Sequence, residues 1–209
     1  MLINVPVGFE NAEPVSDMSP DRTISVVTTS RFVGLDEVYG DLNLERSVKE
    51  MIDADSGRAI YLQAGIGNDY GDVLSVLSVI RAAGSHSVAL AVSPNKDSDV
   101  HKHALSVQLS KEPEAPSKAK PNPMALDVEV KADGHIVLNG KPAGTLEDIG
   151  KLTTSLTDTI KSRANASDKI VTVKGTKTSR YWEIVKVVSA GKGTGASAIV
   201  LVVDDIQEK

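Results

Sequence analysis

The chain contains no cysteine and few aromatic residues among its 209 residues. Without cysteine it has no disulfide framework, no thiolate zinc site and no cysteine nucleophile. Two Phe, four Tyr and one Trp are too few for a base-stacking surface, and the formal charge of −5 lacks the basic footprint that neutralises phosphates. Apolar runs are short: Ala198–Val203 has the length of a buried strand, far below the roughly 18 residues of a membrane span. The sequence therefore predicts no nucleic-acid partner.

A glycine-rich loop, Gly65–Gly71, is the best candidate for a ligand site. It follows an expected strand and opens an expected helix, where backbone amides can hold a phosphate. Its spacing is GxGxxxG, however, and the next strand ends without the acidic residue that binds a ribose. We interpret it as a helix-entry turn with Asn68 or Asp69 as N-cap, and a nucleotide site is the alternative.

Other candidate sites have ordinary explanations. Gly191–Gly195 resembles a phosphate loop in composition but lies after a helix and before a strand, the reverse of the required order. His101 and His103 have metal-ligand spacing without a third ligand, and Asp204-Asp205 is a charged pair near the end of the chain. We therefore predict no catalytic residue, no cofactor and no metal.

An internal repeat appears when the chain is shifted against itself by about 111 positions, the self-similarity that marks repeated units. Tyr70 then falls on Tyr181, Gly84 on Gly195, and the last apolar run of the first copy on that of the second. In each copy a one-faced helix lies between two strands, and Gly84 and Gly195 fall where a left-handed residue ends a helix. A strand, helix and strand in this order predict a parallel βαβ unit.

The upstream parts of the two copies differ. In the second copy Asp133-Gly134 separates two alternating runs and predicts a hairpin, and Thr145–Asp148 predicts a capping box that opens a helix. In the first copy Phe32–Tyr39 takes the place of the Asp-Gly hairpin. We predict an α+β or α/β fold of two tandem β-β-α-β-α-β domains, each a mixed sheet with two helices on one face.

The predicted domain boundaries follow from proline and charge. Residues 1–21 form a leader and 22–93 the first domain. Residues 94–124 contain five of the nine prolines with many Lys and Glu, which predicts an extended, semi-rigid linker. Residues 125–205 form the second domain.

The second copy resembles the extracytoplasmic domain of the ExbD/TolR biopolymer-transport family. The resemblance is carried by the hairpin, the capping box, both strands and the Tyr-to-Gly helix, in residues 126–141, 145–148, 170–173, 181–188 and 195–201. The first copy is a weaker match, mainly over 60–92. The resemblance implies a non-enzymatic part of a proton-driven envelope motor, beside an ExbB/TolQ-like channel protein, acting on a TonB/TolA-like protein or peptidoglycan.

The resemblance also implies a place and a mode of assembly. We expect a periplasmic protein anchored to the inner membrane, with this chain as an excised part of it; a natural protein without an anchor is the alternative, and the upstream gene sequence would distinguish the two. The two copies would form an intrachain pseudo-dimer, or pair between chains as a homo-dimer. The rival hypothesis is a cytosolic tandem ligand- or nucleotide-binding module that uses Gly65–Gly71.

Four residues are candidates for dimerisation or partner binding. In ExbD/TolR family members the last strand helps to dimerise and to dock partners. Leu90 and Leu201 hold the corresponding positions in the two copies, which makes them candidates, although a role as core leucines explains them equally well. Tyr70 and Tyr181 recur at the first turn of a helix. We favour for them an amphipathic residue that covers the sheet edge with its hydroxyl in water, and a shared partner surface is the alternative.

Overall fold

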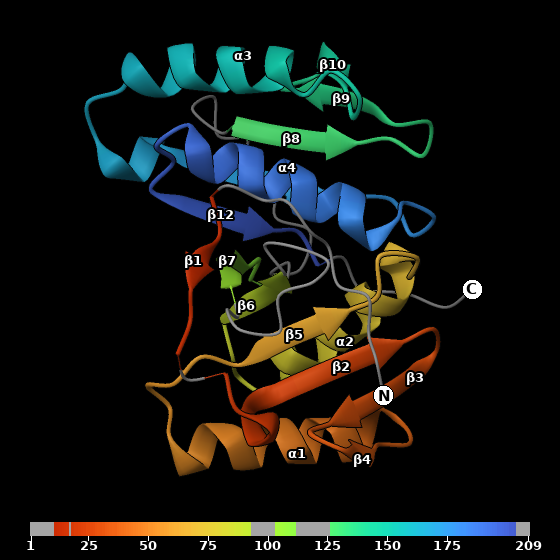
Figure 1. Cartoon of the computed structure of the whole chain (residues 1–209). Coiled ribbons are helices and arrows are strands. Elements are labelled where there is room, and N and C mark those ends of the chain that lie inside the picture. Colours follow the sequence, from red (N-terminus) through yellow and green to blue (C-terminus); the bar gives the residue numbers. More distant parts are fainter. Residues whose placement is uncertain (1–10, 17, 93–102, 112–125, 204–209) are drawn as a thin grey trace, which may run out of the picture.

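The structure, a computed structural model, describes residues 11–16, 18–92, 103–111 and 126–203. Within these residues the chain forms twelve strands and four α-helices, arranged around one mixed sheet (Figure 1). The predicted mixture of helices and a mixed sheet is confirmed. The sheet is continuous through both halves of the chain, so the sheet itself does not divide the chain into two tandem domains.

Both halves have the same order of elements. The first half comprises β2 (Thr23–Val27), β3 (Ser30–Val33), β4 (Asp36–Glu37), α1 (Asp41–Ala54), β5 (Tyr61–Ala64), α2 (Tyr70–Ala82) and β6 (Ser87–Val92). The second half comprises β8 (Leu126–Val130), β9 (His135–Leu138), β10 (Lys141–Thr145), α3 (Gly150–Lys161), the short 3-10 helix η2 (Ala166–Asp168), β11 (Ile170–Lys174), α4 (Tyr181–Gly193) and β12 (Ala198–Leu201). Each half therefore contains one strand more than the predicted β-β-α-β-α-β, because β4 and β10 extend the hairpins.

The hairpin predicted for the second half alone occurs in both. Gly134, with a φ of +80°, turns β8 into β9. In the first half β2 pairs with β3 through a turn without glycine, in which Thr28 takes the left-handed conformation with a φ of 53°. The predicted capping box is also displaced: Thr145 ends β10 and α3 begins at Gly150, although the Thr145 hydroxyl accepts the Asp148 amide at 3.2 Å.

The sheet joins the two halves through a strand that the linker prediction missed. The strand order is β10-β9-β8-β11-β12-β7-β6-β5-β2-β3-β4, where β7 is His103–Leu109. β7 pairs antiparallel with β6 along its whole length and parallel with the end of β12. The residues predicted as linker thus contain the strand at the centre of the sheet. Inside the predicted leader, β1 (Glu13–Pro14) pairs with the start of β7, and the 3-10 helix η1 (Pro20–Arg22) precedes β2.

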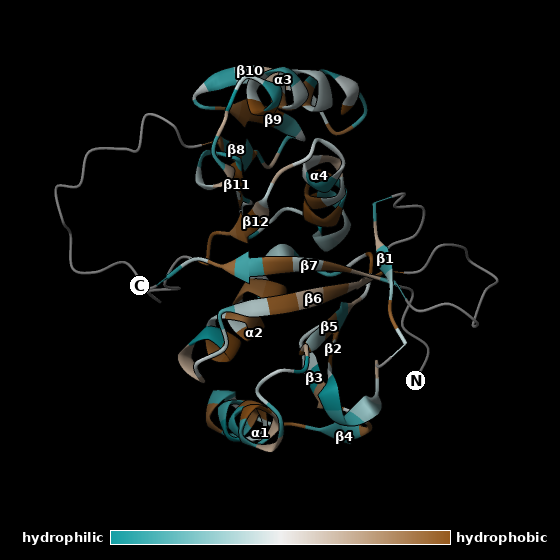
Figure 2. Cartoon of the chain, turned by 90° about the vertical axis from the view of Figure 1, so that its left-hand side faces the viewer, coloured by the Kyte–Doolittle hydropathy of each residue, from teal (hydrophilic) through white to brown (hydrophobic). Residues whose placement is uncertain are grey.

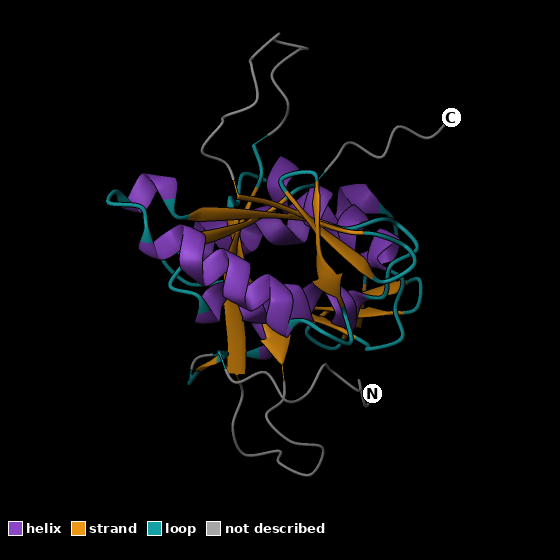
Figure 3. Cartoon of the chain, turned by 90° about the horizontal axis from the view of Figure 1, so that it is seen from above, coloured by secondary structure: helices purple, strands orange, loops and turns teal. Residues whose placement is uncertain are grey.

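The helices pack on one face of the sheet and share one core. Neighbouring helices contact each other in the order α1, α2, α4, α3, so α2 and α4 meet in the middle. Alternate residues of the strands face this core, as the period of two along a strand requires; those at its centre include Ile24, Leu62, Leu90, Leu105, Leu126, Val171 and Leu201. In Figure 2 the middle strands β6 and β12 are predominantly apolar, whereas β7 between them alternates between apolar and polar residues. Figure 3 shows how strongly the sheet twists beside its helices.

The opposite face of the sheet is covered in the first half by the N-terminal segment. Tyr61, Ala89 and Ala104 form a small second cluster there, and Val15 and Met18 pack against it. The described residues before β2, 11–16 and 18–22, are therefore part of the folded unit.

Candidate functional site

The two halves meet at a junction between two loops that each follow a strand and open a helix. We call the pair formed by residues 65–71 and 175–181 the junction loops. The Tyr70 amide donates to the Ser179 carbonyl at 2.7 Å, and the Tyr181 amide donates to the Asn68 carbonyl at 2.9 Å. Each bond maps onto the other when 111 is added or subtracted. The junction is thus a reciprocal contact of the kind that a two-fold dimer interface has.

Side chains reinforce the same contact. Asp69 and Arg180 form an isolated antiparallel bridge through their backbones, and their side chains form an ion pair at 2.7 Å. The Arg180 guanidinium also donates to the Gly67 carbonyl at 3.0 Å. Asn68 is almost fully buried, accepts the Gly65 amide at 3.0 Å and donates to the Thr28 carbonyl at 2.9 Å. Asn68 therefore fixes the shape of its loop for the other half to pair with.

The two tyrosines lie inside this junction. Tyr70 and Tyr181 are each 1% exposed, and both hydroxyls are buried. The expectation that these hydroxyls reach water is wrong, because both are buried where the two halves meet. Burial raises the pKa of Tyr181, and the neighbouring Tyr70 raises it further. The Tyr70 ring packs so closely on Gly175 that a methyl group there would lie 2.8 Å from the ring.

Leu90 and Leu201 lie on the two strands that flank β7. Leu90 pairs with Leu105 and Leu201 pairs with Leu109 in the strand register, and both leucines are 1% exposed in the shared core. The structure thus places the four candidate residues where the halves meet, the tyrosines at the junction loops and the leucines beside β7. Whether they take part in pairing outside this chain stays a prediction.

A buried arginine holds the end of β12 against the first half. Arg81, in the last turn of α2, is 5% exposed and donates to the Val203 carbonyl at 2.6 Å. On the other side, the Asn11 side chain donates to the Ser189 carbonyl in α4 at 2.9 Å. Neither contact could be found from periodicity, because each joins residues more than 100 positions apart.

Four backbone amides of the Gly65–Gly71 loop donate within the protein. Gly65 donates to Asn68, Asn68 to Gly65, Tyr70 to Ser179, and Gly71 to Lys177 at 2.9 Å. A phosphate at the start of α2 would compete with the second half of the chain for these donors. The loop is an interface element, which agrees with the interpretation of it as a helix-entry turn.

The remaining candidates are the glycines near a helix end and two polar pairs that the structure describes only in part. Gly191 and Gly193 belong to the last turn of α4, and Gly195 ends it with a φ of +83°, as predicted. His103 is half-buried in β7, whereas His101 and Asp204-Asp205 lie outside the described residues. Over residues 11–16, 18–92, 103–111 and 126–203, no group of three or more His, Asp or Glu side chains is arranged to hold a metal ion.

Among the helices of the described segments, none combines the length and the apolarity needed to cross a bilayer.

These features define an α+β protein whose central contact is an interface between two similarly built halves. The family model described as "Biopolymer transport protein ExbD/TolR" matches residues 98–205, just over half of the chain. The chain belongs to the ExbD/TolR family. Members of this family are non-enzymatic components of biopolymer transport and energy transduction, work with ExbB/TolQ-type partners and are anchored in the inner membrane with a periplasmic domain. A comparison with curated proteins found none that matches the chain.

Proposed function

We propose that the chain is the extracytoplasmic part of an envelope energy-transduction complex, in which its two halves act together as an intrachain pseudo-dimer. It carries no reaction of its own, and it transmits force between an ExbB/TolQ-type proton channel and a TonB/TolA-like protein or peptidoglycan. The observation that carries the proposal is the reciprocal pairing of the junction loops, together with the family membership.

Physical reasoning favours the intrachain arrangement. Two separate chains lose translational and rotational freedom when they pair, whereas two halves of one chain meet at a high effective concentration. β7 strengthens the link, because it pairs with both β6 and β12. A tethered pair held by a shared central strand stays assembled under load at concentrations where separate domains would dissociate.

Three measurements test this function. Analytical ultracentrifugation of the chain should give a monomer, and a stable dimer at micromolar concentration would replace the intrachain pair by pairing between chains. Co-sedimentation with purified sacculi tests peptidoglycan binding, and its failure would remove the TolR-like role while leaving the ExbD-like one. Affinity capture with the ExbB/TolQ-type protein of the same genome tests the motor itself. If neither sacculi nor that complex retains the chain, the proposed function is wrong.

The cytosolic nucleotide-binding alternative receives no support from the junction, where the amides of Gly65, Asn68, Tyr70 and Gly71 already donate within the protein. A thermal-shift panel of NAD, ATP and GTP should leave the melting temperature unchanged. A clear stabilisation by any of them would favour that alternative.

A further inference from the structure

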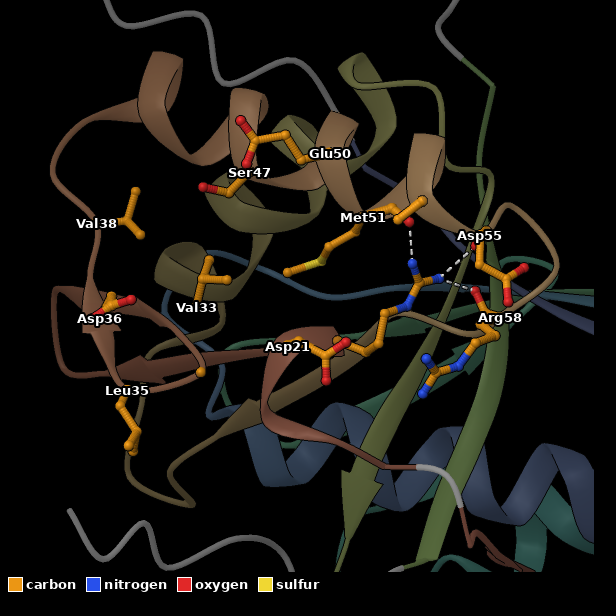
Figure 4. Close-up of a pocket in the computed structure, with 13 residues that line it drawn as sticks. Asp21, Val33, Leu35, Asp36, Val38, Ser47, Glu50, Met51, Asp55 and Arg58 are labelled. Atoms are coloured by element: carbon orange, nitrogen blue, oxygen red, sulfur yellow. Dashed lines mark hydrogen bonds between the residues drawn. The ribbon is translucent and has the colours of Figure 1, made fainter.

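A cleft of about 870 Å³ opens in the first half, away from the junction loops, between α1 and the β3–β4 hairpin (Figure 4). Its two walls come from different elements: Ser47 and Glu50 extend from α1, and Asp36 and Val38 lie on the hairpin side. The cleft is large enough for a few side chains of a partner segment, since ligand pockets span about 300–1,000 Å³.

The inner part of the cleft is apolar and its rim carries one exposed leucine. Val33 and Met51 lie between the two walls, and Val33 and Val38 are only partly buried by the protein itself. Leu35 at the rim is 89% exposed. An exposed leucine beside a hollow with valine and methionine in its lining offers a partner an apolar surface to cover.

The charges around this apolar centre are predominantly negative. Asp21, Asp36, Glu50 and Asp55 all line the cleft, and the hydrogen bond from the Ser19 side chain lowers the pKa of Asp21. Four carboxylates around an apolar centre would repel nucleic acid and anionic lipid, and would attract cationic side chains.

The two arginines of the cleft do not offset this field equally. Arg22 is 3% exposed, and its guanidinium donates to backbone carbonyls of Met51, Asp55, Arg58 and Ala59. Arg22 therefore holds the C-terminal end of α1 in place as one side of the cleft. Arg58 donates to the Ser19 hydroxyl at 3.1 Å at one end of the cleft. The rim formed by Asp36 and Glu50 lies toward the other end of the cleft, away from Arg58 in Figure 4.

We propose that this cleft binds a short segment of a partner polypeptide in which an apolar side chain is flanked by lysines or arginines. The apolar side chain enters between Val33 and Met51 and contacts Leu35, and the flanking cations face Asp36 and Glu50. The inference rests on the surface of the first half alone and does not depend on the proposed function. The specificity comes from the combination, since exposed ion pairs alone contribute little.

The test uses a fluorescein-labelled peptide, Lys-Lys-Leu-Lys-Lys, titrated into the full chain and followed by anisotropy. Isotope-labelled chain, titrated with the unlabelled peptide and followed by amide chemical shifts, locates the site. We expect shifts confined to residues 33–38 and 47–58. Two control peptides separate the contributions: Glu-Glu-Leu-Glu-Glu should not bind, and Lys-Lys-Ser-Lys-Lys should bind more weakly. Equal binding of the serine peptide would overturn the role of the apolar centre.

Charge-reversal variants test the acidic rim. Asp36→Lys with Glu50→Lys should weaken peptide binding by about tenfold or more, because two attractive contacts become repulsive. Glu147→Lys with Asp158→Lys makes the same change in net charge on exposed positions of the second half and should leave the affinity within about twofold. Equal weakening by both pairs would show a general charge effect and overturn the site.

Two matched leucine variants test the apolar rim. Leu35→Ser should weaken binding severalfold, whereas Leu42→Ser, 79% exposed on α1 but not part of the cleft, should not. All four altered positions in the first half are exposed, and circular dichroism checks that each variant is folded. If ultracentrifugation instead shows that the chain self-associates and that Asp36→Lys with Glu50→Lys abolishes it, the occupant is a second copy and the proposal is wrong.

Discussion

Asp69 and Arg180 pair twice across the junction, once through their backbones and once through a 2.7 Å contact between carboxylate and guanidinium. Both side chains are about half exposed, at 55% and 53%, so water screens the ion pair. The backbone bonds of the adjacent buried tyrosines have no such screening. The stability of the junction therefore depends mainly on its backbone pairing and packing.

Removing the charge of Arg180 should accordingly cost little. We expect Arg180→Met to lower the free energy of unfolding by less than about 1 kcal/mol, because an exposed pair contributes at most that much. Urea unfolding followed by circular dichroism measures the change, and Arg46→Met on the exposed side of α1 is the control. A loss several times larger would mean that the ion pair holds the halves together.

Closing the space beneath the Tyr70 ring should cost more. A Cβ at Gly175 would lie 2.5 Å from the Ile184 side chain and 2.8 Å from the Tyr70 ring, and both of these side chains are fully buried. Gly175→Ala should therefore lower the free energy of unfolding by about 1–3 kcal/mol, as overpacking does. Gly67→Ala is the matched control in the opposite loop, since its Cβ would meet nothing within 4 Å. Equal effects of the two variants would contradict this account of the packing.

The sequence predicted the parts of the fold that depend on local periodicity. The 111-residue offset placed Tyr70 and Tyr181 at equivalent positions, and the helix-ending glycines, Gly84 with a φ of +102° and Gly195, are confirmed. These features follow from patterns within one helix or strand. The hairpin of the first half, β2–β3, was not predicted because Thr28 in its turn adopts a conformation that glycine or asparagine usually takes.

The central strand and the junction needed information that no local pattern holds. β7 carries the strict alternation of a strand at Leu105, Val107 and Leu109, but the prolines and charges on both sides of it indicated a linker. The pairing of the junction loops joins residues about 111 positions apart, and nothing in a single glycine-rich loop indicates which backbone will take its amides. The loop was therefore correctly interpreted as a turn, without its partner.

Arg22 offers a test of the wall between η1 and α1. Its guanidinium nitrogens donate to several carbonyls near the end of α1, and the side chain is 3% exposed. A lysine side chain at this position has a single nitrogen and cannot donate to all of these carbonyls. Arg22→Lys should lower the free energy of unfolding by about 1.5–3 kcal/mol, the range for hydrogen bonds to charged groups. Differential scanning calorimetry should show the loss, while Arg46→Lys on the exposed side of α1 should show none.

The hydroxyl of Tyr181 should make the protein sensitive to alkaline pH. Burial, followed by the nearby Tyr70, raises its pKa in the folded state above the ordinary value of 10.0. Above that value the unfolded chain loses the phenol proton while the folded chain keeps it. The folded state then binds more protons, so the free energy of unfolding falls as the pH rises, by up to about 1.4 kcal/mol per pH unit for one such group.

Tyr181→Phe separates this group from every other one that titrates at high pH. Within the described structure the buried hydroxyl has no hydrogen-bond partner, so its removal should leave stability at pH 7 unchanged or raise it by about 1 kcal/mol. Urea unfolding of both proteins between pH 8 and pH 11, about the ordinary tyrosine pKa, should show a shallower decline for the variant. If the free energy of unfolding declines equally with pH in both proteins, the hydroxyl lies in water and the buried junction is contradicted. An exposed phenol has the same pKa in the folded and the unfolded state and therefore gives no pH dependence of its own.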